Sequence, residues 1–179
     1  MTGMQSRWQP QPLIGDAQLR RWLLDRGSLT RRIQMRCQNF RLDVLSQGFA
    51  RACRDEYAVI EEHRGTRCLV REVSLNCGSQ PVVFAHTVVA PRALKGAWRM
   101  LRRLGTHPLG AALFADPCIK RYPLRFRQLN GHHALYQRAR VLITGCPAKL
   151  WARRSLFVLR GSPLLVTEVF LPAILALPR

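Results

Sequence analysis

Residues 67–89 read RCLVREVSLNCGSQPVVFAHTVV, and their pattern is the strongest indication of fold in the chain. Two runs rich in β-branched and aromatic residues, 67–75 and 82–89, flank the segment 76–80, which contains a glycine. A short turn between two such runs is typical of an antiparallel β-hairpin. The stretch therefore predicts two neighbouring antiparallel strands.

A second hairpin is predicted near the C-terminus, where the β-rich runs 152–160 and 163–171 meet at Gly161 and Ser162. Helical patterns precede and separate the hairpins, an order that favours an α+β domain on a mostly antiparallel sheet over an alternating parallel one. The length of 179 residues suits one domain. We expect a flexible segment over residues 1–15 and one domain over residues 16–179, with helices packed on the sheet and loops covering an internal ligand pocket.

Helical spacing of apolar residues recurs elsewhere in the chain. Asp16 is placed to cap a first helix, Ser28 begins a short helical piece over residues 29–36, and a strand is expected from Phe40. After Pro91 a single helix ending at Gly105 is predicted, followed by a loop over residues 106–110. The apolar residues of that helix are Leu94, Trp98, Leu101 and Leu104. A further helix in the long segment 121–149 is indicated by Leu135, Ala139 and Leu142.

The chain is strongly basic, with 29 Lys and Arg against 10 Asp and Glu and a net charge of +19. Such a surface attracts polyanions such as nucleic acid or anionic lipid, and it also steers small dianions. The basic residues form scattered pairs that we expect on a solvated surface: Arg20–Arg21, Arg31–Arg32, Arg102–Arg103, Lys120–Arg121 and Arg153–Arg154. Because no zinc-finger spacing or RNP-type aromatic motif accompanies them, specific nucleic-acid binding is not expected.

The lack of a signal peptide in the sequence and the spacing of the cysteines favour a cytoplasmic location. Residues 1–15 hold no apolar run of signal-peptide length, and the apolar stretch 164–177 is too short and too interrupted to cross a bilayer, so membrane insertion is not expected. The six cysteines show no zinc or dithiol spacing, and we expect reduced thiols, although an even number leaves disulfides open. They are Cys37, Cys53, Cys68, Cys77, Cys118 and Cys146.

Strand parity singles out two charged residues. Side chains alternate between the faces of a sheet, so Arg71 shares an otherwise apolar face with Leu69, Val73 and Leu75. By the same rule Glu168 is the single charge on a face formed with Leu164, Val166 and Phe170. Two lone charges of opposite sign are therefore expected to point toward the core.

Two interpretations of these charges remain open. Arg71 and Glu168 could form a buried ion pair, or neighbouring groups could satisfy each of them separately, the ordinary outcomes for lone inward charges. Alternatively, they could line an apolar pocket in which the guanidinium binds a carboxylate and the carboxylate accepts from a hydroxyl, as a hydroxy acid requires. We expect His132 and His133 on the surface and His86 as a satisfied core or edge residue, and no residues with metal-ligand spacing.

Four blocks of sequence resemble the chorismate lyase family, in the right order and over nearly the whole chain. They are WLLDRGSLTRRI at 22–33, REVSL at 71–75, THPLGAALF at 106–114 and LWARRSLFVLRGSPLLVTEVFLP at 150–172. The segment 121–149 is longer than in compact family members. A different class shares the fold, the small-acid-sensing domain of helix-turn-helix repressors, which binds its effector without turning it over.

The resemblance implies a cofactor-free lyase that converts chorismate to 4-hydroxybenzoate and pyruvate in the cytoplasm, the first committed step toward ubiquinone, and we expect a monomer. It makes Arg71 and Glu168 catalytic and ligand-binding side chains. It also implies that backbone groups of Leu29 and Leu109 contact the ligand, so that residues 28–36 and 106–110 become candidate flaps over the pocket. No metal and no cofactor are expected.

Overall fold

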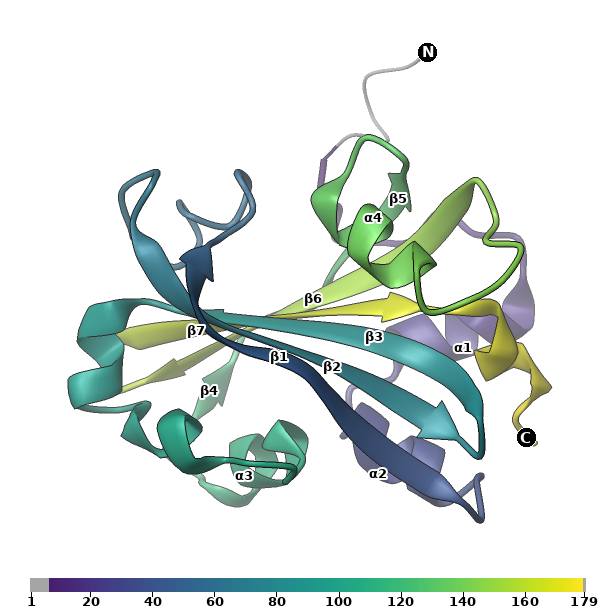
Figure 1. Cartoon of the computed structure of the whole chain (residues 1–179), viewed down its shortest axis with the longest axis horizontal. Coiled ribbons are helices and arrows are strands. Elements are labelled where there is room, and N and C mark those ends of the chain that lie inside the picture. The colour runs from purple at the N-terminus through teal and green to yellow at the C-terminus, as the bar shows by residue number, and fades with distance from the viewer. Residues whose placement is uncertain (1–6, 179) are drawn as a thin grey trace.

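Seven antiparallel strands form one open sheet in the computed structural model, which describes residues 7–178 (Figure 1). The strands are β1 (Phe40–Arg51), β2 (Arg67–Cys77), β3 (Gln80–Val89), β4 (Lys120–Arg121), β5 (Arg125–Asn130), β6 (Lys149–Leu159) and β7 (Ser162–Phe170). Their order is β1-β2-β3-β7-β6-β4, and β5 also pairs with β6. Both predicted hairpins, β2–β3 and β6–β7, are confirmed, as is the α+β class.

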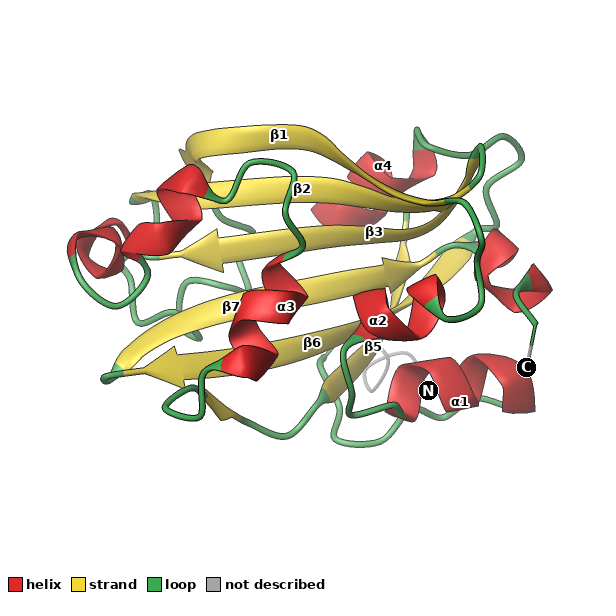
Figure 2. Ribbon diagram, turned by 90° about the horizontal axis from the view of Figure 1, so that it is seen from below, coloured by secondary structure: helices red, strands yellow, loops and turns green. Residues whose placement is uncertain are grey.

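Helices cover the two faces of this sheet unequally. They are α1 (Ala17–Leu24), α2 (Leu29–Gln34), α3 (Leu109–Ala115) and α4 (Ala134–Arg140), with 3-10 helices η1 (Pro91–Lys95), η2 (Arg99–Arg103) and η3 (Pro172–Ala176). Figure 2 shows α1, α2 and α3 on one face and α4 behind the sheet. None of the helices in the described part is long and apolar enough to cross a membrane.

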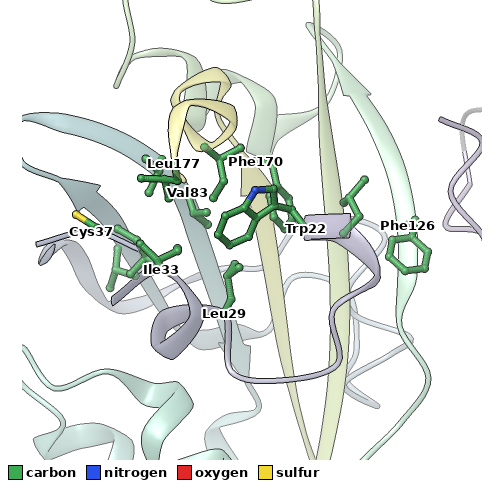
Figure 3. Close-up of a cluster of buried hydrophobic side chains, with 13 residues drawn as sticks. Trp22, Leu29, Ile33, Cys37, Val83, Phe126, Phe170 and Leu177 are labelled. Carbon is green, nitrogen blue, oxygen red and sulfur yellow. The ribbon is translucent and has the colours of Figure 1, made fainter. Parts of the chain in front are cut away.

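The largest core cluster lies between the sheet and the first two helices (Figure 3). Trp22 of α1 and Ile33 of α2 pack there against Val83 and Phe170 of the sheet. On the other face, Leu135 of α4 packs in a second cluster, which confirms the helix expected in the long segment 121–149. The strands β2, β3, β6 and β7 are thus largely buried on both faces, and their side chains of alternating parity enter two different environments.

The helix expected after Pro91 is wrong in type. The chain forms two short 3-10 helices interrupted at Gly96, whose backbone has left the helical region at φ −127° and ψ −109°. The predicted apolar spacing still holds, because Leu94, Trp98 and Leu101 are buried. The loop expected over residues 106–110 is also too long, since α3 begins at Leu109.

The expectation of reduced thiols is wrong for one pair. Cys37 and Cys77 form a disulfide with their Cα atoms 5.7 Å apart. The register of β1 against β2 explains the proximity, because Phe40 lies opposite Cys77 and places the start of β1 beside the end of β2. The sequence separation of 40 between the two cysteines means that local spacing cannot predict this relation. The other four cysteines are free.

Two basic side chains expected on the surface are buried instead: Arg153 is 0% exposed and Arg154 is 5% exposed. They lie next to each other on β6, between the two neighbouring strands β5 and β7, and point to opposite faces. Arg154 donates to the carboxylate of Asp55 over 3.0 Å and stacks on the ring of Trp8. Residues 1–6 of the segment expected to be flexible lie outside the described residues, whereas Trp8 thereby contacts the body of the domain.

Candidate active site

A cavity of about 620 Å³, part of it open to solvent, lies between the sheet and the segments that carry α2 and α3. Its walls come mainly from β2, β3, β6 and β7, with Leu42 of β1 and Arg121 of β4, and its cover comes from residues 27–30 and 109–114. All four residues singled out by sequence, Leu29, Arg71, Leu109 and Glu168, line it.

Arg71 projects from β2 into this cavity and is 4% exposed. Its Nη1 donates to Oε1 of Gln47 over 2.6 Å and its Nη2 to the backbone carbonyl of His107 over 3.4 Å. Both acceptors are neutral, and burial lowers the pKa of Arg71 below its ordinary value. The guanidinium nevertheless stays charged, and it has no carboxylate partner in the described part of the chain. Its remaining N–H groups are free to bind an anion.

Glu168 does not pair with Arg71, so the ion pair considered between them is not formed. Its partner is Arg153, directly opposite on β6, whose Nε donates to Oε2 over 2.5 Å. Arg153 also donates through Nη1 to three carbonyls at the end of α1, including that of Asp25 at 2.6 Å. Cationic side chains commonly satisfy the last carbonyls of a helix in this way. One oxygen of Glu168 is thus held by Arg153, while the carboxylate lines the cavity.

A third arginine, Arg121 of β4, lines the same cavity. Its Nη2 donates to Oγ of Ser155 over 2.8 Å, and its Nη1 donates to the backbone carbonyl of Arg26. The guanidinium carbon lies 5.1 Å from the ring centre of Phe114 and 5.4 Å from that of Phe157. Its Nε is buried and has no hydrogen-bond partner among residues 7–178.

Sequence reasoning missed Arg153 and Arg121, although a signal existed for the first. Alternation along β6 places Arg153 on the cavity face with Trp151, Ser155 and Phe157, as alternation had placed Glu168 on β7. The doublet with Arg154 hid this pattern and suggested a solvated surface. Arg121 gave no such signal, because β4 has only two residues and its place depends on pairing with Phe157 of β6.

The two covering segments meet closely above the cavity. A Cβ atom at Gly110 in α3 would lie 3.2 Å from Oγ of Ser28 and 3.7 Å from Oγ1 of Thr30. Glycine at this position therefore permits the contact between the start of α2 and the start of α3. Leu29 directly follows Ser28 and Leu109 directly precedes Gly110, so both residues lie at this junction above the cavity.

A separate charged cluster lies on the opposite face of the sheet. His86 is fully buried, with Nδ1 2.9 Å from Oε1 of Glu72 and Nε2 3.2 Å from Oε2 of Glu56. Burial alone would lower the pKa of His86, but the two carboxylates raise it to about 9. The expected satisfied core histidine is therefore confirmed. His133, expected on the surface, is instead buried at 9% exposure, where it caps α4 and lies 3.7 Å from Asp55.

This cluster also contains the one group of potential metal ligands found in the described residues, a grouping that local spacing did not predict. Cys53, Glu56 and His86 offer ligand atoms within 4.8 Å of one another. His86 and Glu56 already bind each other, and burial raises the pKa of the Cys53 thiol, which keeps the sulfur protonated. These contacts satisfy the cluster internally, and it lies on the other side of the sheet from the cavity.

Comparisons with known proteins agree with this architecture. Residues 4–177 match the family model for chorismate lyase. Proteins named probable chorismate pyruvate-lyase are 53% identical in Nitrosomonas europaea, over 93% of this chain and 94% of that protein, and 51% identical in Nitrosospira multiformis, over 96% of both.

Solved structures show the same fold at low identity. The C-terminal domain of a histidine utilization repressor from Pseudomonas syringae pv. tomato superposes with a TM-score of 0.55 at 12% identity, covering 75% of this chain and 92% of that one. The effector domain of PhnF from Mycobacterium smegmatis also has a TM-score of 0.55, at 14% identity over 83% and 91% of the two chains. Since the family model covers nearly the whole chain and relatives about half identical match it almost end to end, the chain belongs to the chorismate lyase family.

Proposed function

We propose that this protein is a cofactor-free lyase that converts chorismate to 4-hydroxybenzoate and pyruvate. The observation that carries the proposal is the cavity itself, in which Arg71 has no carboxylate partner and Glu168 presents a carboxylate from a separate strand. A buried cation without a counter-ion is unfavourable until an anion binds beside it. The family supports chorismate as that anion.

The reaction requires the enzyme mainly to hold chorismate in the conformer that eliminates. The C3–O bond to the enolpyruvyl group breaks and the hydrogen leaves ring carbon C4, which makes the ring aromatic. The proton ends on the methylene carbon of the departing enolpyruvate, giving pyruvate, so atoms and electrons balance without a redox partner. A cavity that binds both ends of the substrate with fixed charged groups, and that the two covering segments close over, can hold the eliminating conformer and is suited to such a reaction.

Each cavity residue receives a role in this proposal. Arg71 binds the ring carboxylate of chorismate, for which a guanidinium offers two parallel N–H groups. Glu168 accepts from the ring hydroxyl through the oxygen that Arg153 leaves free. Backbone groups of Leu29 and Leu109, in the two covering segments, close over the ligand.

The resemblance further supports a role in ubiquinone synthesis, a cytoplasmic location and a monomeric enzyme. The Cys37–Cys77 disulfide is the one described feature that favours an oxidising environment over a reducing one. Measuring free thiols in protein purified without reductant tests this point directly. Two fewer titratable thiols than the sequence contains would show that the bond forms in solution.

One assay tests the proposed function. Purified protein is mixed with chorismate, and pyruvate is measured continuously through lactate dehydrogenase and NADH. We expect pyruvate and 4-hydroxybenzoate in equal amounts, and no pyruvate above background from an Arg71→Met variant. Binding of chorismate without release of pyruvate would instead support the sensing function, the alternative from another class that shares this fold.

A further inference from the structure

The charges that line the cavity do not balance. The charged residues in its wall are Arg71, Arg121, Arg153 and Glu168. Three cations against one anion leave an excess of two positive charges in a largely enclosed space. Buried charge of one sign is costly unless a counter-charge accompanies it. The cavity is therefore matched to a ligand with two negative charges.

Two of the three arginines carry this excess. Arg153 is neutralised by Glu168, its partner across β6 and β7. Arg71 and Arg121 form no ion pair with any residue of the described chain, and all their hydrogen-bond acceptors are neutral groups. In addition, the Nε–H of Arg121 is buried without an acceptor. Each of these two guanidiniums can thus bind one carboxylate through its N–H groups.

Sheet register places them at opposite ends of the cavity. Arg71 lies opposite Thr87, Thr87 opposite Val166, and Val166 opposite Ser155, which binds Arg121. Three strand spacings of about 4.8 Å separate the Cα atoms of Arg71 and Ser155 by roughly 14 Å. Glu168 lies on β7, which is next to β6 and two strands away from β2, so its carboxylate belongs to the Arg121 end.

We propose that Arg121 binds the enolpyruvyl carboxylate of chorismate, an assignment that rests on the function proposed above. In chorismate the ring carboxylate at C1 and the hydroxyl at C4 lie across the ring, and the enolpyruvyl ether at C3 adjoins the hydroxyl. With the ring carboxylate on Arg71 and the hydroxyl on Glu168, the second carboxylate falls at the end where Arg121 lies. Arg121 touches the substrate and is in this sense a catalytic residue.

The assignment makes Arg121 the residue that separates substrate from product. 4-Hydroxybenzoate retains the ring carboxylate and the hydroxyl, and it lacks the carboxylate that Arg121 binds. Arg121 also contacts both covering segments, through the carbonyl of Arg26 just before α2 and the ring of Phe114 in α3. When pyruvate leaves, the carboxylate that neutralised the Arg121 guanidinium between the two covering segments is lost.

The test compares Arg121→Gln with Lys120→Gln, a control that removes the neighbouring exposed cation of the same strand. We expect Arg121→Gln to lower kcat/KM for chorismate by about 10- to 150-fold, the usual effect of losing a charge-assisted hydrogen bond. The dissociation constant of 4-hydroxybenzoate, measured by calorimetry, should change less than threefold. Lys120→Gln should alter neither. Equal losses for substrate and product, or an unchanged kcat/KM, would overturn the assignment.

A second measurement does not require the variant to fold. In the wild-type protein, 3-(carboxymethoxy)-4-hydroxybenzoate adds a carboxylate on the oxygen at the enolpyruvyl position and should bind at least tenfold more tightly than 4-hydroxybenzoate. The advantage should fall in Arg121→Lys, which keeps the charge but loses the fork. If this dianion binds no more tightly than 4-hydroxybenzoate, Arg121 has only a structural role and the assignment is wrong. Wild-type protein that releases no pyruvate would refute the lyase function, while this affinity ratio would still decide the role of Arg121.

Discussion

Replacing Arg71 with Met separates a ligand-binding cation from a structural one. Two charge-assisted hydrogen bonds to a carboxylate contribute about 1.5 to 3 kcal/mol each, so their loss should weaken 4-hydroxybenzoate binding by about 150- to 25,000-fold. Met fills a similar volume without a charge. Because Arg71 is 4% exposed and has no described carboxylate partner, its removal also relieves an unpaired buried charge.

The free energy of unfolding decides between the two roles. A partner removed from a buried ion pair costs about 3 to 5 kcal/mol of stability. We expect the ligand-free Arg71→Met protein to lie within about 1 kcal/mol of the wild type or above it, since only neutral contacts to Gln47 and the His107 carbonyl are lost. Calorimetric titration and urea denaturation measure both quantities, with exposed Arg125→Met as the control. Binding within threefold of wild type, or a loss of stability near that of a broken ion pair, would refute the reasoning.

Four further outcomes follow from the structure. Glu168→Gln should reduce the affinity advantage of 4-hydroxybenzoate over benzoate, at least severalfold in the wild type, because an unpaired buried carboxylate costs about 1 to 3 kcal/mol or more; calorimetry with both acids measures it. Replacing Cys37 and Cys77 with Ala should lower the free energy of unfolding by about 4 kcal/mol in urea denaturation, the loop-closure value for a sequence separation of 40. The stabilisation from His86, whose folded pKa of about 9 exceeds the unfolded value of about 6.5, should be complete below pH ~6.5 and lost as pH rises through about 9, whereas His86→Gln should flatten this dependence of the melting temperature. Dialysis against EDTA should leave the lyase rate unchanged, because the Cys53, Glu56 and His86 group lies across the sheet from the cavity.

Strand parity was sufficient to find Arg71 and Glu168 because it depends only on local alternation. It places each side chain on a face and says nothing about its neighbours on the next strand. The partner of Glu168 follows from register, which sets Arg153 opposite it on β6. The ion pair considered between Arg71 and Glu168 was wrong for that reason, since β3 lies between their strands.

Helical elements show the same division between local and distant information. The spacing of Leu94, Trp98 and Leu101 correctly predicted which side chains are buried. It could not predict 3-10 geometry, because the break at Gly96 depends on how the chain turns to place Trp98, whose Nε1 donates to the carbonyl of Ser162 on β7. The disulfide between Cys37 and Cys77 likewise depends on β1–β2 register.

The buried charges behind the sheet are paired within the chain, whereas two arginines of the cavity are not, and this difference predicts which substitutions affect stability and which affect ligand binding. Behind the sheet, His86 forms ion pairs with Glu56 and Glu72 within the chain itself, so removing His86 leaves the buried Glu56 carboxylate without its ion-pair partner and destabilises the protein. In the cavity, Arg71 and Arg121 have no ion-pair partner in the described chain, and a bound anionic ligand would supply the counter-charge. Their removal should spare the ligand-free fold and weaken ligand binding, and the rise in melting temperature that a saturating ligand normally produces should shrink accordingly. Melting temperatures measured with and without 4-hydroxybenzoate should therefore divide the variants into two groups. Variants of His86 should have a low melting temperature and a normal increase of it on ligand binding. Variants of Arg71 should have a normal melting temperature and a reduced increase on ligand binding. Arg121 variants should join neither group with this ligand, since 4-hydroxybenzoate lacks the carboxylate assigned to that guanidinium.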